Sequence, residues 1–176
     1  MDRSGKIRSI WNRLLLEDVV APTFTQLLLG VRGLLGPTNL YYSLWPNGSF
    51  EEPWNLLVKQ IYRNIRNAPV LYSELEGGKW VSPDEAFLYD DEFSKSKELS
   101  EALVQLGMPI VHLPNILFNM LLKDASDFKQ KVITPDMVRH FLRGCKTLVS
   151  LGKPYKLVLL EYCLEDIVDD EVVTYA

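Results

Sequence analysis

The segment over residues 69–93 constrains the fold most, because it commits part of the chain to a β-hairpin. Residues 70–76 are rich in β-branched and aromatic side chains, and residues 79–81 begin a return strand. Gly77 and Gly78, which lie between them, supply the positive φ angles that a tight turn requires. The chain is therefore expected to contain a small sheet in addition to any helices.

Helical periodicity dominates the rest of the sequence. The clearest helix is predicted over residues 54–65, where apolar side chains recur at three- and four-residue spacing. The same spacing predicts further helices over residues 7–15, 23–35, 99–106, 116–122, 138–149 and 155–167. A short buried strand is predicted over residues 110–113. If the rings of Trp54 and Phe141 are buried, alanine at either position should destabilise the fold by ~3–5 kcal/mol.

Turn and cap residues place the ends of these elements. Pro22 is expected to interrupt the first helix, because proline lacks the N–H that a helix interior needs. Thr23 and Thr134 are expected to cap the helices that follow them, and Ser82 a helical turn after the hairpin. Gly107 is expected to end the helix that precedes the buried strand.

These elements predict an α+β fold that is mostly helical, with several amphipathic helices packed on a small sheet that contains the hairpin. The chain has 176 residues, of which 47% are hydrophobic and 24% charged, which suits a compact domain. We expect one module over residues 1–176, with a candidate subdivision into residues 1–68 and 69–176. The sequence leaves open whether the helices form one core or two.

The charge distribution is uneven. The net charge of −4 gives no overall attraction for nucleic acid or for an anionic membrane. However, residues 123–156 hold eight basic and three acidic side chains, whereas residues 157–176 hold six acidic and no basic ones. Two neighbouring elements are therefore expected to attract each other, and ordinary solvated helix faces are the alternative.

Compartment signals favour the cytoplasm. Two cysteines are too few for a disulfide framework, and no secretory signal opens the sequence. Uninterrupted apolar runs, such as residues 14–16 and 27–29, are far shorter than the ~20 residues that span a bilayer. No membrane insertion is expected.

Candidate chemical sites are weak. Cys145 follows His140 by five residues, which separates their side chains by ~140° on a helix. We therefore interpret Cys145 and Cys163 as small core residues, not as nucleophiles. Two histidines and two cysteines without a CxxC or HxxxH pair do not predict a zinc site. No catalytic or metal-binding residue is expected.

Two other patterns also predict no bound cofactor. The acidic clusters at residues 90–92 and 165–171 lack the spacing of a calcium-binding loop, so solvated surface is favoured over weak calcium binding. Gly30, Gly33 and Gly36 do not match a phosphate-binding loop, and close helix packing explains them better.

An aromatic group in the predicted loop over residues 38–49 is the candidate interaction site. Tyr41, Tyr42, Trp45 and Phe50, together with the nearby Trp54, could line a peptide groove, because Tyr and Trp are enriched at protein interfaces. The alternative is that these rings fill the core.

Three segments carry a family resemblance. PVLYSELEGGKWVSPDEAFLYDDEF (69–93), LGMPIVHLPNILFNMLL (106–122) and KLVLLEYCLEDI (156–167) closely resemble the internal repeat region of the sacsin family. The resemblance implies a cytoplasmic co-chaperone that regulates the seventy-kilodalton heat-shock protein system and is linked to intermediate-filament handling. Repeats of that family also carry modules similar to the nucleotide-binding domain of the ninety-kilodalton heat-shock protein.

Most of those family activities have no residues to match here. A J-domain requires His-Pro-Asp, whereas His112 is followed by Leu113 and His140 by Phe141. The nucleotide-binding module requires an Asp-x-Gly-x-Gly run, which this sequence lacks. The resemblance therefore implies connecting repeat architecture and not an enzyme.

Two functions follow as hypotheses. The first is a non-catalytic scaffold whose apolar faces, around Trp54, Met120 and Tyr162, contact adjoining repeat modules, with heat-shock chaperones and clients reached through the parent chain. The second is an accessory role in a nucleotide-driven chaperone cycle. In that role a basic residue such as Arg32, Arg139 or Arg143 reaches ATP bound by a neighbouring module.

Overall fold

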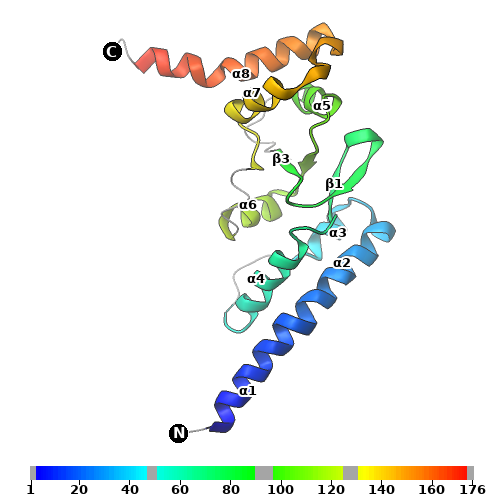
Figure 1. Cartoon of the computed structure of the whole chain (residues 1–176), viewed down its shortest axis with the longest axis vertical. Coiled ribbons are helices and arrows are strands. Elements are labelled where there is room, and N and C mark those ends of the chain that lie inside the picture. Colours follow the sequence, from blue (N-terminus) through cyan, green and yellow to red (C-terminus); the bar gives the residue numbers. More distant parts are fainter. Residues whose placement is uncertain (1–2, 47–50, 90–96, 125–130, 174–176) are drawn as a thin grey trace.

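The computed structural model describes residues 3–46, 51–89, 97–124 and 131–173. It is an α+β fold, mostly helical, with one small mixed sheet, as the sequence predicted (Figure 1). The elements are α1 (Arg3–Leu14), the π-helix η1 (Leu15–Val20), α2 (Ala21–Leu35), α3 (Asn39–Ser43), α4 (Trp54–Ile65), β1 (Leu71–Ser73), the 3₁₀-helix η2 (Leu75–Gly77), β2 (Lys79–Val81), β3 (Phe87–Tyr89), α5 (Lys97–Gln105), β4 (Ile110–His112), α6 (Asn115–Asp124), α7 (Pro135–Gly144), the 3₁₀-helix η4 (Lys146–Ser150) and α8 (Lys153–Val173).

The sheet has the strand order β2-β1-β4-β3. The predicted hairpin is confirmed, since β1 and β2 are antiparallel and pair Leu71 with Val81. The connection is longer than a two-residue turn, because η2 precedes Gly78. β4 then pairs antiparallel to β1 and parallel to β3. The sequence analysis did not predict β3, whose three residues are too few for a clear alternating pattern.

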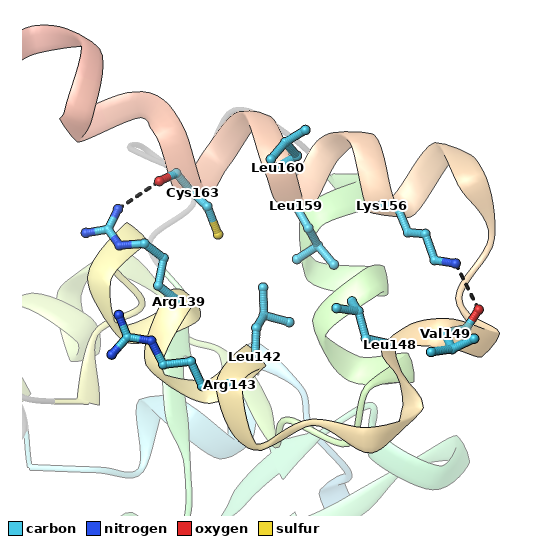
Figure 2. A pocket seen from close by; sticks show the side chains of 9 residues that line it. All are labelled: Arg139, Leu142, Arg143, Leu148, Val149, Lys156, Leu159, Leu160 and Cys163. Carbon is cyan, nitrogen blue, oxygen red and sulfur yellow. Dashed lines mark hydrogen bonds between the residues drawn. The ribbon is translucent and has the colours of Figure 1, made fainter.

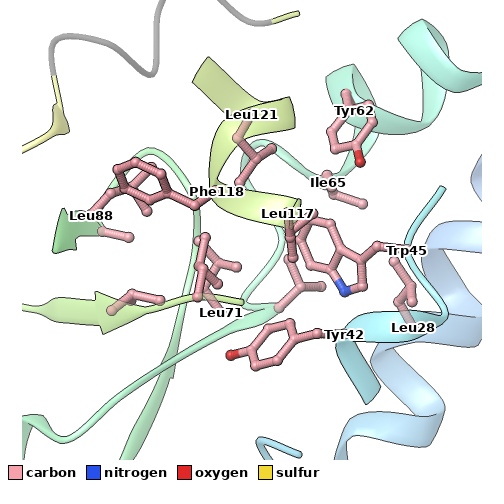
Figure 3. Packing of buried hydrophobic residues seen from close by; sticks show 14 of the residues in the cluster. Leu28, Tyr42, Trp45, Tyr62, Ile65, Leu71, Leu88, Leu117, Phe118 and Leu121 are labelled. Carbon is pink, nitrogen blue, oxygen red and sulfur yellow. The ribbon is translucent and has the colours of Figure 1, made fainter. Parts of the chain in front are cut away.

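The sheet separates two apolar cores. Successive side chains of a strand point to opposite faces, so Leu88 and Val111 join the first core whereas Tyr89 and Ile110 join the second. Helices α2, α3, α4 and α6 cover the first core, and α5, α7 and α8 cover the second (Figures 1 and 3). The first core combines residues from both sides of residue 68.

The N-terminal helix differs from the prediction, because it continues past Pro22. From Arg3 to Leu35 the segments α1, η1 and α2 follow one another without a break. The Ala21 N–H donates to the carbonyl of Leu16, five residues back instead of four. The hydrogen-bonded turn just before the proline therefore contains one more residue than an α-helical turn. This π-helical turn lets the helix accommodate a residue without an N–H. The predicted interruption at Pro22 is therefore wrong.

Other expectations in this helix also need correction. Thr23 does not cap a helix, because its hydroxyl donates to the carbonyl of Val19 at 2.7 Å within the helix. The apolar stripe of the helix predicted over residues 23–35 includes Leu27 and Leu28, but Leu27 is 51% exposed, whereas α2 buries Ala21, Thr25 and Leu28. Close packing does not explain Gly30 or Gly33, since a Cβ atom at either would meet no atom within 4 Å.

Two more predicted elements end differently. Residues 38–49 are not all loop, because Asn39–Ser43 form α3 and the Thr38 hydroxyl accepts from the N–H of Tyr41 at 3.3 Å. The sequence Asn47-Gly48 favours a turn within the predicted loop, and it lies outside the described residues. The helix predicted over residues 138–149 stops at Gly144, because Cys145 has an extended backbone.

The remaining helices agree with the predictions. The helix α5 buries Leu99 and Leu103, and Gly107 ends that region with a φ of 93°. The Thr134 hydroxyl caps α7 by accepting from the N–H of Met137 at 3.3 Å. The predicted strand over residues 110–113 is confirmed as β4. Ser94 and Ser96 are candidate caps for the helix predicted over residues 99–106, and both lie outside the described residues.

At Ser82 the predicted cap is reversed, because Ser82 donates instead of accepting. Its N–H and its hydroxyl both bond to the Glu85 carboxylate, at 3.0 and 2.9 Å. The residues that follow form a hydrogen-bonded turn that leads into β3.

We expect two tryptophans to differ sharply in their effect on stability. Trp45 is 1% exposed in the first core, whereas Trp54 is 56% exposed, contrary to the predicted stripe. Trp45→Ala should lower the free energy of unfolding by about 3–5 kcal/mol, since it leaves a large cavity. Trp54→Ala should change it by only about 0.5 kcal/mol. Urea unfolding followed by circular dichroism measures both. Equal losses in the two variants would contradict this packing.

Candidate functional site

The aromatic group predicted as a peptide groove lies mainly in the core. Tyr41, Tyr42 and Trp45 are at most 5% exposed, and the Tyr41 hydroxyl donates to the carbonyl of Val70 at 2.9 Å. Burial raises the pKa of Tyr41 above its usual value, because the ionised phenol would lose its hydration. A peptide cannot reach these rings without opening the core. Phe50 lies outside the described residues.

A Ser–His contact joins α5 to β4, and the sequence analysis did not anticipate it. Ser100 Oγ lies 3.0 Å from Nε2 of His112, a distance that suits a nucleophile and its base. Ser100 is only 5% exposed, however, so a substrate cannot reach its hydroxyl in this conformation. We interpret the contact as a structural hydrogen bond between helix and sheet. In the described part of the chain, no three His, Cys, Asp or Glu side chains are grouped to hold a metal ion.

A groove opens between α7, η4 and α8, with a volume of about 730 Å³ (Figure 2). The break at Cys145 creates it, because the chain turns away from α7 and η4 forms a third wall. Leu142, Leu148 and Leu159 point toward its centre (Figure 2). The full lining is Arg139, Leu142, Arg143, Leu148, Val149, Lys156, Leu159, Leu160 and Cys163. The groove is therefore apolar inside, and the charged groups among its lining residues are all cationic.

One of these cations fixes the groove's geometry. Arg139 on α7 contacts the Asp166 carboxylate on α8 with two nitrogens, at 2.6 and 2.9 Å, and the carbonyl of Cys163 at 2.8 Å. The predicted attraction between the basic segment and the acidic C-terminal segment is confirmed at this pair. The hydrogen bonds to Asp166 hold the pKa of Arg139 above its usual value. Arg139 thus joins the two walls and is not available to a ligand.

The other two cations differ in their engagement. Lys156 donates to the carbonyl of Val149 at 2.8 Å, while Arg143 is exposed and has no hydrogen-bond or ion-pair partner among the described residues. Arg32, in the other half of the molecule, donates to the carbonyl of Pro69 and lies over the Trp80 ring. Of the three arginines considered for nucleotide contact, Arg143 alone is unengaged within the described segments.

Two exposed apolar surfaces lie apart from the groove floor. On α1 and the start of η1, the side chains of Ile10, Trp11, Leu14 and Leu15 are 46–67% exposed. On the outer side of α8, Leu157, Leu160 and Leu164 are 43–55% exposed and form a ridge at three- and four-residue spacing, and Leu160 also lines the edge of the groove. Apolar residues at helical spacing indicated both stripes in the sequence. Spacing alone does not show which apolar stripe packs against another element of the protein.

The N-terminal helix also meets the criteria for a membrane span by length and composition. The segment Arg8–Leu35 has 28 residues, and its most apolar window of 18 residues has a mean hydropathy of 1.4, with 17% of that window buried. Core helices of soluble proteins, which are mostly buried, and signal sequences near an N-terminus meet the same criteria. Here one face of α2 packs on the protein itself, through Ala21, Thr25 and Leu28.

No protein-family model, curated protein or solved structure matches this chain.

The two cysteines should differ in reactivity. Cys163 is 8% exposed beside the groove, and burial raises its thiol pKa, so little thiolate exists near neutral pH. Cys145 is half-buried. Iodoacetamide at pH 8 should therefore modify Cys145 first, as peptide mass spectrometry can measure, and a higher pH should reduce the difference. Faster modification of Cys163 would show that the groove wall opens readily.

Proposed function

We propose that this chain is a non-catalytic scaffold and protein-interaction module of a sacsin-like co-chaperone that regulates the seventy-kilodalton heat-shock chaperone system in the cytoplasm. Its direct partners are adjoining repeat modules, and the chaperones and client proteins are reached through the parent chain. The resemblance over residues 69–93, 106–122 and 156–167 supports the family. The groove between α7 and α8 is the observation that supports protein binding.

The chemistry of the groove favours an amphipathic segment with acidic side chains. An apolar interior gains free energy by taking up apolar side chains, at roughly 25 cal/mol per Å² of surface removed from water. The cationic side chains that line the groove favour acidic side chains at the edge of a bound segment. Arg143 is the side chain best placed to pair with an acidic side chain of the bound segment, because Arg139 is held by Asp166.

A peptide-binding measurement tests this proposal. The probe is a fluorescein-labelled helical peptide with leucines at i, i+3 and i+7 and glutamates beside them. A second peptide carries lysine in place of every glutamate. Fluorescence anisotropy with the full chain should show binding of the acidic peptide and at least about tenfold weaker binding of the basic one, because only the acidic peptide complements the groove.

Matched charge reversals locate that binding on the chain. Arg143→Glu should weaken binding of the acidic peptide by about tenfold and improve binding of the basic one. Arg63→Glu reverses an exposed charge on α4, far from the groove, and should change neither. Equal binding of both peptides, or equal effects of the two reversals, would contradict recognition by the groove.

The nucleotide-linked alternative keeps one supporting observation, the unengaged Arg143. The two functions differ in their response to nucleotide. For the scaffold role, magnesium-ATP should leave the melting temperature of the chain unchanged, because a ligand stabilises only a fold that binds it. A melting temperature that rises with ATP concentration would favour the alternative.

A further inference from the structure

Arg139 lines the groove, yet a carboxylate of the same chain already occupies its guanidinium group. Two guanidinium nitrogens of Arg139 contact the two carboxylate oxygens of Asp166, at 2.6 and 2.9 Å. Arginine binds the carboxylate of a ligand with the same forked geometry. Asp166 therefore lies where an acidic side chain of a bound segment would bind if Arg139 were open to it.

Arg139 and Arg143 form a pair of cations on α7. They are four residues apart, which places them on one face of the helix, and both line the groove. Figure 2 shows both side chains at the end of the groove that lies away from Lys156 and Val149. Like charges at this spacing repel each other, and Asp166 offsets the charge of only one of them. A segment with two acidic side chains would offset both.

The ion pair is open to exchange, because neither side chain is buried. The side chain of Arg139 is 26% exposed and that of Asp166 is 44% exposed. An ion pair in contact with water contributes little free energy, so the carboxylate of a ligand can replace Asp166 without a large loss.

A second hydrogen bond keeps Arg139 in place when Asp166 leaves. The same guanidinium group donates to the main-chain carbonyl of Cys163 at 2.8 Å, and this carbonyl moves only if α8 moves. The buried side chains of Leu159 and Cys163 hold α8 against the second core. Release of Asp166 therefore exposes the guanidinium group without separating the two walls of the groove.

We propose that Asp166 is an internal acidic group that blocks half of the groove's cationic pair in the free chain. An acidic side chain of the bound segment replaces it, so that Arg139 and Arg143 hold the segment together. The inference rests on the proposed function, because it concerns the regulation of the same groove. The affinity for an acidic segment then depends on how well that segment competes with the chain's own carboxylate.

Asp166→Asn tests this contact, because it removes the charge and keeps the shape of the side chain. Fluorescence anisotropy with the full chain measures the same acidic and basic helical peptides. Asp166→Asn should bind the acidic peptide about fivefold more tightly than the wild type does, since the guanidinium group of Arg139 is then available. It should not bind the basic peptide more tightly.

Glu165→Gln is the matched control. Glu165 directly precedes Asp166 and is exposed, and its side chain has no hydrogen-bond or ion-pair partner among the described residues. Its replacement removes the same charge from the same turn of α8, but solvent screens that charge, so the affinity should change by less than about twofold. Equal gains in the two variants would indicate a general charge effect and would overturn the role of Asp166.

Arg139→Gln in the Asp166→Asn background identifies the group that receives the ligand's carboxylate. The double variant should lose the gain in affinity for the acidic peptide, because the released guanidinium group is absent. A gain that survives would show that another cation receives the acidic group, which would overturn the proposal. Weaker binding of both peptides by Asp166→Asn would also overturn it, since Asp166 would then only hold the walls together.

The outcomes for the wild type separate this inference from the proposed function. If the wild type binds the acidic peptide and Asp166→Asn shows no gain, the internal acidic group is overturned and the groove remains the binding site. An acidic peptide that binds none of the four proteins would overturn both. All four should melt cooperatively, because Asp166 and Glu165 are exposed and Arg139 lies at the surface of the second core.

Discussion

The rest of the structure depends on the parallel pairing of β3 with β4. These strands lie at the centre of the molecule, and their side chains alternate between the two cores, with Leu88 and Val111 on one face and Tyr89 and Ile110 on the other. Each core buries its helices against one face of the same short sheet. Loss of this pairing would therefore expose apolar surface on both sides, which ties the two halves of the chain into one structure.

At the second core, one ion pair determines the shape of the surface. Arg139 joins α7 to Asp166 on α8, and the chain between these helices bends at Cys145 to form the wall of the groove. An exposed ion pair contributes little free energy, but a two-nitrogen contact fixes geometry. The groove with its cationic lining is thus a consequence of how α7 ends and where Asp166 lies.

Sequence reasoning recovered most elements and missed particular boundaries for physical reasons. The stripe over residues 54–65 and the capping residue Thr134 were sufficient to predict α4 and the start of α7, because both signals are local. The continuation of the helix through Pro22 required a π-helical turn, which no residue type announces. The groove was missed because Leu148 and Val149 fit the helical period of α7, although Gly144 was a signal for an end.

By itself, the sequence determined the fold class, the hairpin and the helix periods, since each depends on neighbouring residues. Only the tertiary structure decided which apolar stripe is covered. Trp45 and Trp54 are equally hydrophobic, yet one is buried and the other exposed. Likewise, the apolar ridge on α8 is exposed, whereas one apolar face of α2 is buried. Burial depends on which elements meet in space, and that arrangement is set by contacts between residues far apart in the chain.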